Sequence, residues 1–146
     1  MCWRGTTTVA DDATGAAPDV EDAAYTPFVD PETDAAAVIA ARAADGKGGT
    51  DTVILRVGEV LGITELFVVT GCRNVRLVRA VVDEVEAHVR ADTGRSPKRI
   101  EGLDDLHWVL MDYGDWVVHV FLDETRGFYD LERLWADVPR VDWAAG

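Results

Sequence analysis

The chain has 146 residues, of which 48% are hydrophobic, and it carries a formal net charge of −13. This length suits one domain with a packed core and is short for two. The acidity argues against a free-standing nucleic-acid binder, which needs a basic face to neutralise phosphates, and it favours a basic partner.

The N-terminal part of the chain divides into a tail and a helix. Residues 1–34 are rich in Ala, Asp and Thr and poor in bulky apolar residues, which predicts a disordered acidic tail. Residues 35–45 follow as a short alanine-rich helix, which Thr33 or Asp34 would cap and Gly46 would end.

Two strands and a long helix are predicted in the middle of the chain. Segments 52–57 and 66–70 are short, β-branched and flanked by turn residues, as buried strands are, and 58–65 connects them. The long helix is predicted over 73–91. Its valines recur at spacings of three and four and mark one buried stripe, made of Val75, Val78, Val81, Val82, Val85 and Val89.

The C-terminal part of the chain contains a short strand, a hairpin and a closing helix. They are predicted at 98–102, at 107–112 with 115–121, and at 128–135. The order of elements predicts a single α/β domain, with a mixed β-sheet of about five strands flanked by helices. The charges of the short strand place it near a sheet edge. We place the domain at 35–138 and a C-terminal tail at 139–146.

The predicted hairpin has two unlike faces. The pairs expected across a turn at 113–114 are Trp108 with His119, Leu110 with Val117, and Asp112 with Asp115. One face is wholly apolar and is expected in the core: Val109, Met111, Trp116, Val118 and Val120. The other face combines Trp108 with polar groups, as a protein-binding hot spot does. The alternative is that Trp108 and His119 simply lie under a helix.

Residues typical of catalysis or metal binding are present without the spacing that those functions need. Asp112 and Asp115 lie three apart across a turn, so they fit turn-stabilising carboxylates better than a pair converging on two metal ions. The three histidines, the single serine and the two cysteines show no ligand or triad spacing. We therefore expect no enzymatic activity, no metal and no cofactor.

The cellular compartment is suggested by what the sequence lacks. Its apolar runs are too short to span a bilayer, and its first residues do not lead into a signal-peptide core. The two cysteines give no disulfide framework. A cytoplasmic protein without a membrane partner is expected.

Gly71 lies between the second strand and the long helix, where a helix N-terminus can attract an anion. Arg73, Arg76 and Arg79 fall in the first turns, against the helix dipole, which suggests an acidic partner or a phosphate. Alternatively, Arg76 and Arg79 pair with nearby carboxylates of this acidic chain. Cys72, at the same position, could have a lowered pKa.

Several short motifs lie in a fixed order between about 35 and 140. They are 63–68, 70–71, 78–80, 83–85, 99–102, 108–115, 117–120 and 128–135. In order and spacing they resemble the ribosomal silencing factor family, RsfS, also called Iojap. The three linked motifs at 99–102, 108–120 and 128–135 make this resemblance more specific than a lone short pattern would be.

The resemblance implies a fold similar to nucleotidyltransferases without their catalytic carboxylates, and a homodimer. It also implies a partner on the large ribosomal subunit, the ribosomal protein numbered fourteen (uL14), and a steric block of small-subunit joining. No sequence-specific nucleic-acid contact is implied. The residues that match the family's binding strand, turn and closing motif are Trp108, Leu110, Asp112, Tyr113, Asp115, His119, Arg126 and Tyr129.

Two other functions remain open at this point. The first is a nucleotidyltransferase-like, nucleotide-binding protein that uses the helix N-terminus after Gly71. The second is a plain dimeric scaffold, in which Trp108 and Tyr113 make only contacts between the two copies.

Overall fold

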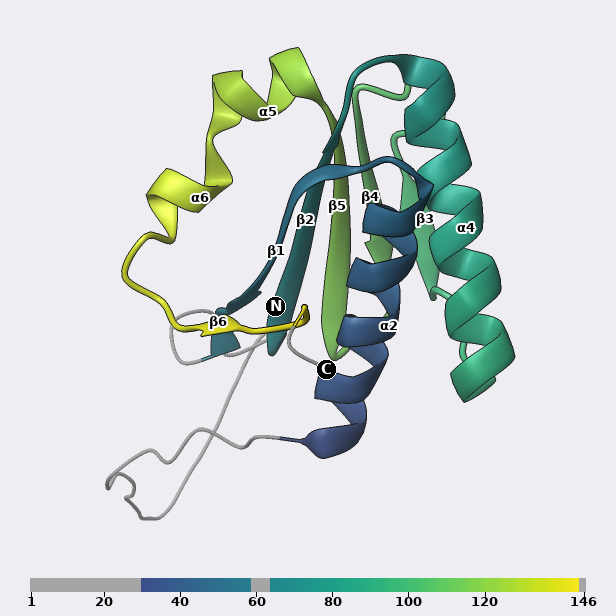
Figure 1. The fold of residues 1–146 in the computed structure, drawn as a ribbon, viewed down its shortest axis with the longest axis vertical. Helices are drawn as coiled ribbons and strands as arrows, with labels where there is room; N and C mark the ends of the chain where they lie inside the picture. Colours follow the sequence, from purple (N-terminus) through teal and green to yellow (C-terminus); the bar gives the residue numbers. More distant parts are fainter. Residues whose placement is uncertain (1–29, 59–63, 145–146) are drawn as a thin grey trace, which may run out of the picture.

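A six-stranded mixed sheet organises the fold, in the order β3-β4-β5-β2-β1-β6 (Figure 1). The structure, a computed structural model, describes residues 30–58 and 64–144. The strands are β1 (Thr50–Arg56), β2 (Leu66–Cys72), β3 (Arg99–Glu101), β4 (Trp108–Asp112), β5 (Trp116–Leu122) and β6 (Arg140–Val141). The β2–β5 pair is parallel and every other pair is antiparallel. The single mixed α/β domain predicted from the sequence is confirmed, with β3 at an edge and one strand more than expected.

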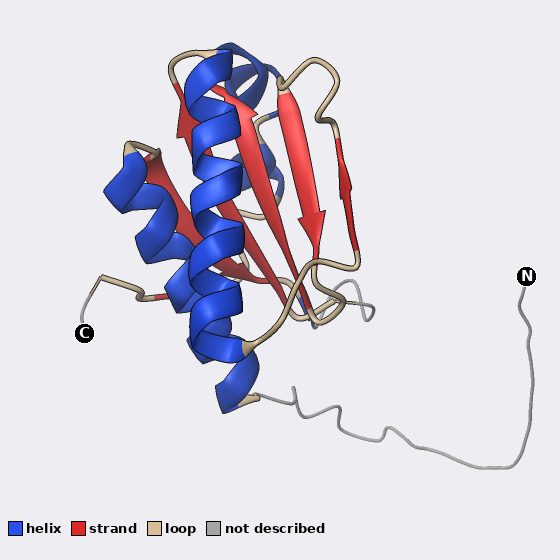
Figure 2. Ribbon diagram, turned by 90° about the vertical axis from the view of Figure 1, so that its right-hand side faces the viewer, coloured by secondary structure: helices blue, strands red, loops and turns tan. Residues whose placement is uncertain are grey.

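Helices cover both faces of the sheet. They are α2 (Pro31–Lys47), α4 (Val75–Thr93), α5 (Asp123–Tyr129) and α6 (Leu131–Leu134). The two long helices, α2 and α4, pack side by side on one face, and the short α5 and α6 lie on the other (Figures 1 and 2). The likeness to nucleotidyltransferase folds stays a prediction.

The α2 helix starts earlier than the sequence analysis placed it. Asp30 is its N-cap and accepts a hydrogen bond from the Glu32 backbone N–H at 3.0 Å, and Pro31 occupies the first turn. Gly48, at φ +123°, ends it instead of Gly46. The helix predicted over 35–45 therefore begins one helical turn earlier, at Pro31. The rest of the predicted N-terminal tail, 1–29, lies outside the described residues.

Small side chains allow α2 to approach the sheet and α4 closely. Six alanines of α2 are buried in the main hydrophobic cluster: Ala36, Ala37, Ala40, Ala41, Ala43 and Ala44. The α4 helix buries the predicted valine stripe except Val75, which is 41% exposed in the first turn. Asn74 caps this helix by accepting from the Leu77 N–H at 2.8 Å, so the helix runs two residues later than predicted.

The C-terminal residues take part in the sheet. Residues 139–146 were predicted to be a tail, but Arg140–Val141 pairs with β1 as β6. Beyond it, the Trp143 indole N–H donates to the Thr52 carbonyl at 2.8 Å, and the Trp143 carbonyl accepts from Arg42 at 3.1 Å. This segment was misjudged because two residues of strand give no periodicity to recognise.

The two faces of the sheet contribute to separate hydrophobic clusters. The larger lies under α2 and α4 and contains the face of the hairpin that was predicted to be core. The smaller one, on the side of α5 and α6, is built from Leu55, Val57, Val69 and Phe121. Along the described parts of the chain, no helix is both long enough and apolar enough to cross a membrane. The predicted connection over 58–65 lies largely outside the described residues.

Candidate functional site

The β4–β5 hairpin has a register shifted by two residues from the predicted one. Trp108 pairs with Phe121, Leu110 with His119 and Asp112 with Val117. The Tyr113 N–H donates to the Trp116 carbonyl at 3.0 Å, so Gly114 and Asp115 make the turn. Because side chains alternate along a strand, a shift of two residues keeps every side chain on its predicted face.

Trp108 lies half-buried on the outer face of β4, at the margin of the smaller cluster. Its ring stacks on Phe121 at a centroid distance of 4.9 Å and meets Tyr129 of α5 at the same distance. Neither interpretation of this face was wholly right, since Phe121 and His119 are buried whereas Trp108 is only partly buried. Trp108 is therefore both anchored from below and available from outside.

His119 fixes the orientation of the Trp108 ring. The Trp108 indole N–H, which can only donate, lies 3.1 Å from His119 Nδ1. Nδ1 must then carry a lone pair and Nε2 the proton, so the imidazole is neutral. Burial lowers the pKa of His119 to about 4. His119 is only 4% exposed, so it lies beneath the surface in contact with Trp108 and is not the surface residue that the sequence suggested.

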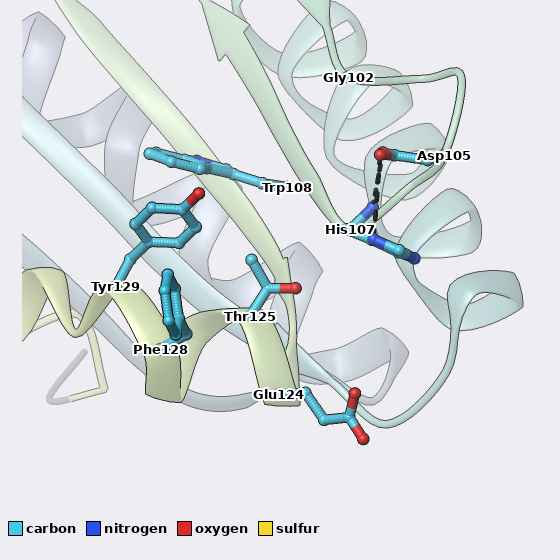
Figure 3. Close-up of a pocket in the computed structure, with 8 residues that line it drawn as sticks. All are labelled: Gly102, Asp105, His107, Trp108, Glu124, Thr125, Phe128 and Tyr129. Carbon is cyan, nitrogen blue, oxygen red and sulfur yellow. Dashed lines mark hydrogen bonds and ion pairs between the residues drawn. The ribbon is translucent and has the colours of Figure 1, made fainter.

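An exposed apolar surface lies on α5 beside Trp108, and of its two aromatic residues only Tyr129 was predicted as a site residue. Phe128 is 82% exposed and Tyr129 51% exposed, and their rings meet edge to face at 5.0 Å (Figure 3). The sequence predicted one continuous helix over 128–135. In the structure α5 ends at Asp130, which adopts φ +49°. Leu134 of α6 is also exposed, at 71%.

The end of the hairpin carries charges that pair with each other. Asp112 Oδ1 accepts from the Gly114 N–H at 2.8 Å, which is the turn-stabilising role predicted for it. Its other oxygen lies 3.6 Å from Arg99 Nε. Asp115 is exposed and lies 3.6 Å from Arg95. No cluster of three or more metal-ligating side chains occurs among the residues that the structure describes.

Tyr113 does not occupy the exposed turn position that was predicted for it. Its side chain is 1% exposed and stacks on Trp116 with a centroid distance of 4.2 Å and an interplanar angle of 2°. Burial raises the pKa of Tyr113 to about 12. The turn lies one residue later than predicted, at 114–115, so this side chain lies in the core instead of at the surface.

Replacing Tyr113 by phenylalanine is expected to change the free energy of unfolding by less than about 1 kcal/mol. The reason is that the buried Tyr113 hydroxyl has no hydrogen-bond partner within the described residues, so little is lost with it. Tyr113→Ala removes the stacked ring and should cost about 3–5 kcal/mol. Urea unfolding of both variants checks this. If Tyr113→Phe keeps wild-type stability but loses partner binding, the Tyr113 hydroxyl contacts the partner, and the surface role predicted from the sequence is right.

Arg126 serves the fold and lies away from the exposed surface. It is 9% exposed, and its guanidinium donates to the Thr50 carbonyl at 2.8 Å and the Asp51 carbonyl at 2.6 Å. It thereby holds α5 to the start of β1. The structure shows this structural role for Arg126, and the role predicted for it at a partner interface stays a prediction.

The segment around Gly71 packs against side chains of α5. Gly71 and Cys72 are buried at the end of β2, and a Cβ at Gly71 would lie 2.6 Å from Asp123 Oδ1. The Asp123 carboxylate beside Gly71 disfavours an anion at this point. Burial raises the pKa of Cys72 to about 11, opposite to the lowered value considered from the sequence. Arg79 pairs with Asp83 at 3.3 Å, as the alternative proposed.

Comparison with known proteins identifies a single family. The family model described as ribosomal silencing factor during starvation matches residues 30–145. A Bacillus subtilis protein named ribosomal silencing factor RsfS is 36% identical over 104 residues, which are 71% of this chain and 87% of that protein. A mouse protein named mitochondrial assembly of ribosomal large subunit protein 1 is 32% identical over 88 residues, which span 58% of this chain and 38% of its own length.

A solved structure supports the same fold. The crystal structure of a Bacillus halodurans protein matches with a TM-score of 0.62 and 33% sequence identity. The match covers 77% of this chain and 99% of that chain. The sheet and its helices are therefore shared over almost the whole length of the solved protein.

Proposed function

This chain belongs to the ribosomal silencing factor family, RsfS, and we propose that it binds the large ribosomal subunit and blocks joining of the small one. Its contact there would be the ribosomal protein numbered fourteen (uL14). The name of the mouse relative refers to assembly of the large subunit, which supports a large-subunit partner. Bacterial relatives are named silencing factors, which supports an inhibitory role.

The observation that carries the proposal is the apolar surface beside Trp108. Trp108, Leu110, Phe128 and Tyr129 form this docking surface, on β4 and α5. Two adjacent aromatic side chains that are at least half exposed are unusual on a soluble domain, and anchors of this kind dominate protein interfaces. Trp108 is rigid before binding, because His119 holds its indole, so little rotamer entropy is lost on docking.

The charge of the chain supports a basic partner. At −13, the chain attracts a positively charged protein from a distance and disfavours direct contact with RNA phosphates. Binding alone would produce the effect, since a domain of this size on the joining face of a subunit excludes the other subunit sterically. The protein would work without turnover, in the cytoplasm, and would be a homodimer when free.

Sedimentation of the purified protein with isolated large subunits tests the proposal. We expect the protein to travel with the large subunit at physiological salt and to remain in the supernatant with small subunits. Adding it before small subunits should lower the fraction of joined ribosomes, measured by light scattering. The proposal fails if the protein does not bind large subunits, or if it binds and subunits join at the normal rate.

A further inference from the structure

A cavity of about 590 Å³ opens between α5 and the loop that precedes β4 (Figure 3). It lies at one end of the docking surface, and its lining combines aromatic rings with carboxylates. The lining residues are Gly102, Asp105, His107, Trp108, Glu124, Thr125, Phe128 and Tyr129. Figure 3 shows the rings of Trp108, Tyr129 and Phe128 on one side of the cavity, and Asp105 with His107 on the other.

The loop wall of the cavity is held in a defined shape. Gly102 has φ +92°, and a Cβ there would collide with the Trp108 carbonyl oxygen. The His107 backbone N–H donates to Asp105 Oδ1 at 3.2 Å, and the His107 ring lies 3.8 Å from the other oxygen of Asp105. Both carboxylate side chains, Asp105 and Glu124, are exposed, so they remain free to meet a ligand without a large desolvation cost.

The chemistry of this lining selects a cation with a flat face. Faces of Trp and Tyr rings attract a cation within about 6 Å, and Trp is the strongest of them. A carboxylate accepts two parallel hydrogen bonds from a guanidinium, whereas an ammonium offers a compact point charge. The cavity brings both kinds of group to one place, and the charge of −13 adds a favourable field.

We propose that this cavity receives an arginine side chain of the protein partner, stacked on the Trp108–Tyr129 rings and paired with Asp105 and Glu124. The inference rests on the proposed function for the identity of the partner. It adds a recognition element. A surface that offers only apolar contacts would bind any apolar segment, whereas the carboxylates favour a basic one.

The cavity is tested first on the protein alone. N-acetyl-arginine amide is titrated into the full chain, and the indole N–H signal of Trp108 is followed by NMR, assigned with a Trp108→Phe variant. The citrulline analogue has nearly the same shape without the charge. The lysine analogue has the charge without the planar guanidinium group. We expect saturable shifts of the Trp108 signal with arginine at millimolar concentration, at least fivefold weaker binding of lysine, and no saturation with citrulline. Equal shifts from arginine and citrulline, or none from either, overturn the proposal.

The second test uses large ribosomal subunits. A double variant, Asp105→Asn with Glu124→Gln, is expected to bind five- to tenfold more weakly than the wild type and to lose part of the salt dependence of binding. The matched control is Asp45→Asn with Asp92→Asn, two exposed carboxylates on α2 and α4, on the opposite side of the sheet (Figure 1). It changes the net charge equally and should alter the affinity less than twofold.

The two tests separate the cavity from the proposed function. If the wild type binds subunits and both double variants bind equally well, the cavity is not the recognition element and the silencing function stands. If arginine saturates the cavity but the wild type does not bind subunits, the cavity stands and the partner is wrong. Equal weakening by both double variants assigns the effect to net charge alone and overturns the inference.

Discussion

Replacing Trp108 by alanine is expected to weaken binding to the large ribosomal subunit by about 30-fold or more, corresponding to about 2 kcal/mol. Trp108 is the centre of the docking surface, in contact with both Phe121 beneath it and Tyr129 beside it. The substitution removes the largest apolar side chain of that surface and leaves His119 Nδ1 without its donor. Sedimentation or fluorescence titration with purified subunits measures the change in Kd.

The chain offers a matched control for this substitution. Trp143 is also half-buried and also donates its indole N–H, to the Thr52 carbonyl at 2.8 Å, but it lies at the opposite edge of the sheet. Trp143→Ala should lower the free energy of unfolding about as much as Trp108→Ala does, and it should leave subunit binding within twofold of the wild type. Equal binding losses in both variants would indicate partial unfolding in place of a lost contact.

The same pair of variants addresses the scaffold alternative. If Trp108 makes only contacts between two copies, Trp108→Ala converts a dimer to a monomer and does not weaken subunit binding. Analytical ultracentrifugation of the free proteins measures the first effect and subunit titration the second. If Trp108 docks on the subunit, Trp108→Ala instead causes a large loss of subunit affinity, whether or not the free dimer dissociates.

The parts of the fold that were predictable are those governed by periodicity. The valine stripe of α4 and the apolar face of the hairpin follow from spacings of three and four and of two. That face came out correctly even though the hairpin register was wrong, because an error of two residues preserves the alternation of sides. The position of Tyr113 depends on which residues form the turn, and there the same error placed a buried side chain at the surface.

The parts that were not predictable depend on local backbone geometry or on distant contacts. Nothing in the run 128–135 predicts that Asp130 takes a left-handed conformation, or that Phe128 and Leu134 are exposed. The start of α2 is set by the Asp30 cap, which competed with Thr33 and Asp34 for the same role. Arg126 finds its partners about 75 residues away in the chain. Sequence motifs suggested the candidate site, and tertiary packing decides which of its residues face outward.

A second expected result concerns pH, since His119 is neutral and buried in the folded protein. Its pKa falls from 6.5 to about 4 on folding, mainly because burial disfavours the charged ring. The unfolded chain therefore binds more protons than the folded one between these two values. Stability rises with pH in that interval: the contribution of His119 is fully present above pH 6.5 and is lost as the pH falls to about 4. A difference of about 2.5 units corresponds to about 3 kcal/mol.

Urea unfolding of the wild type and of His119→Asn at pH 4, 5, 6 and 7 measures this effect. Asparagine offers a carbonyl near the position of Nδ1, so it can still accept from Trp108, and it does not titrate. The carboxylates titrate alike in both proteins and cancel in the difference between their free energies of unfolding. We expect that difference to change by about 3 kcal/mol from pH 7 to pH 4, against the wild type at low pH. A difference that is constant with pH would mean that His119 is open to solvent, and the rigid presentation of Trp108 would then lose its physical basis.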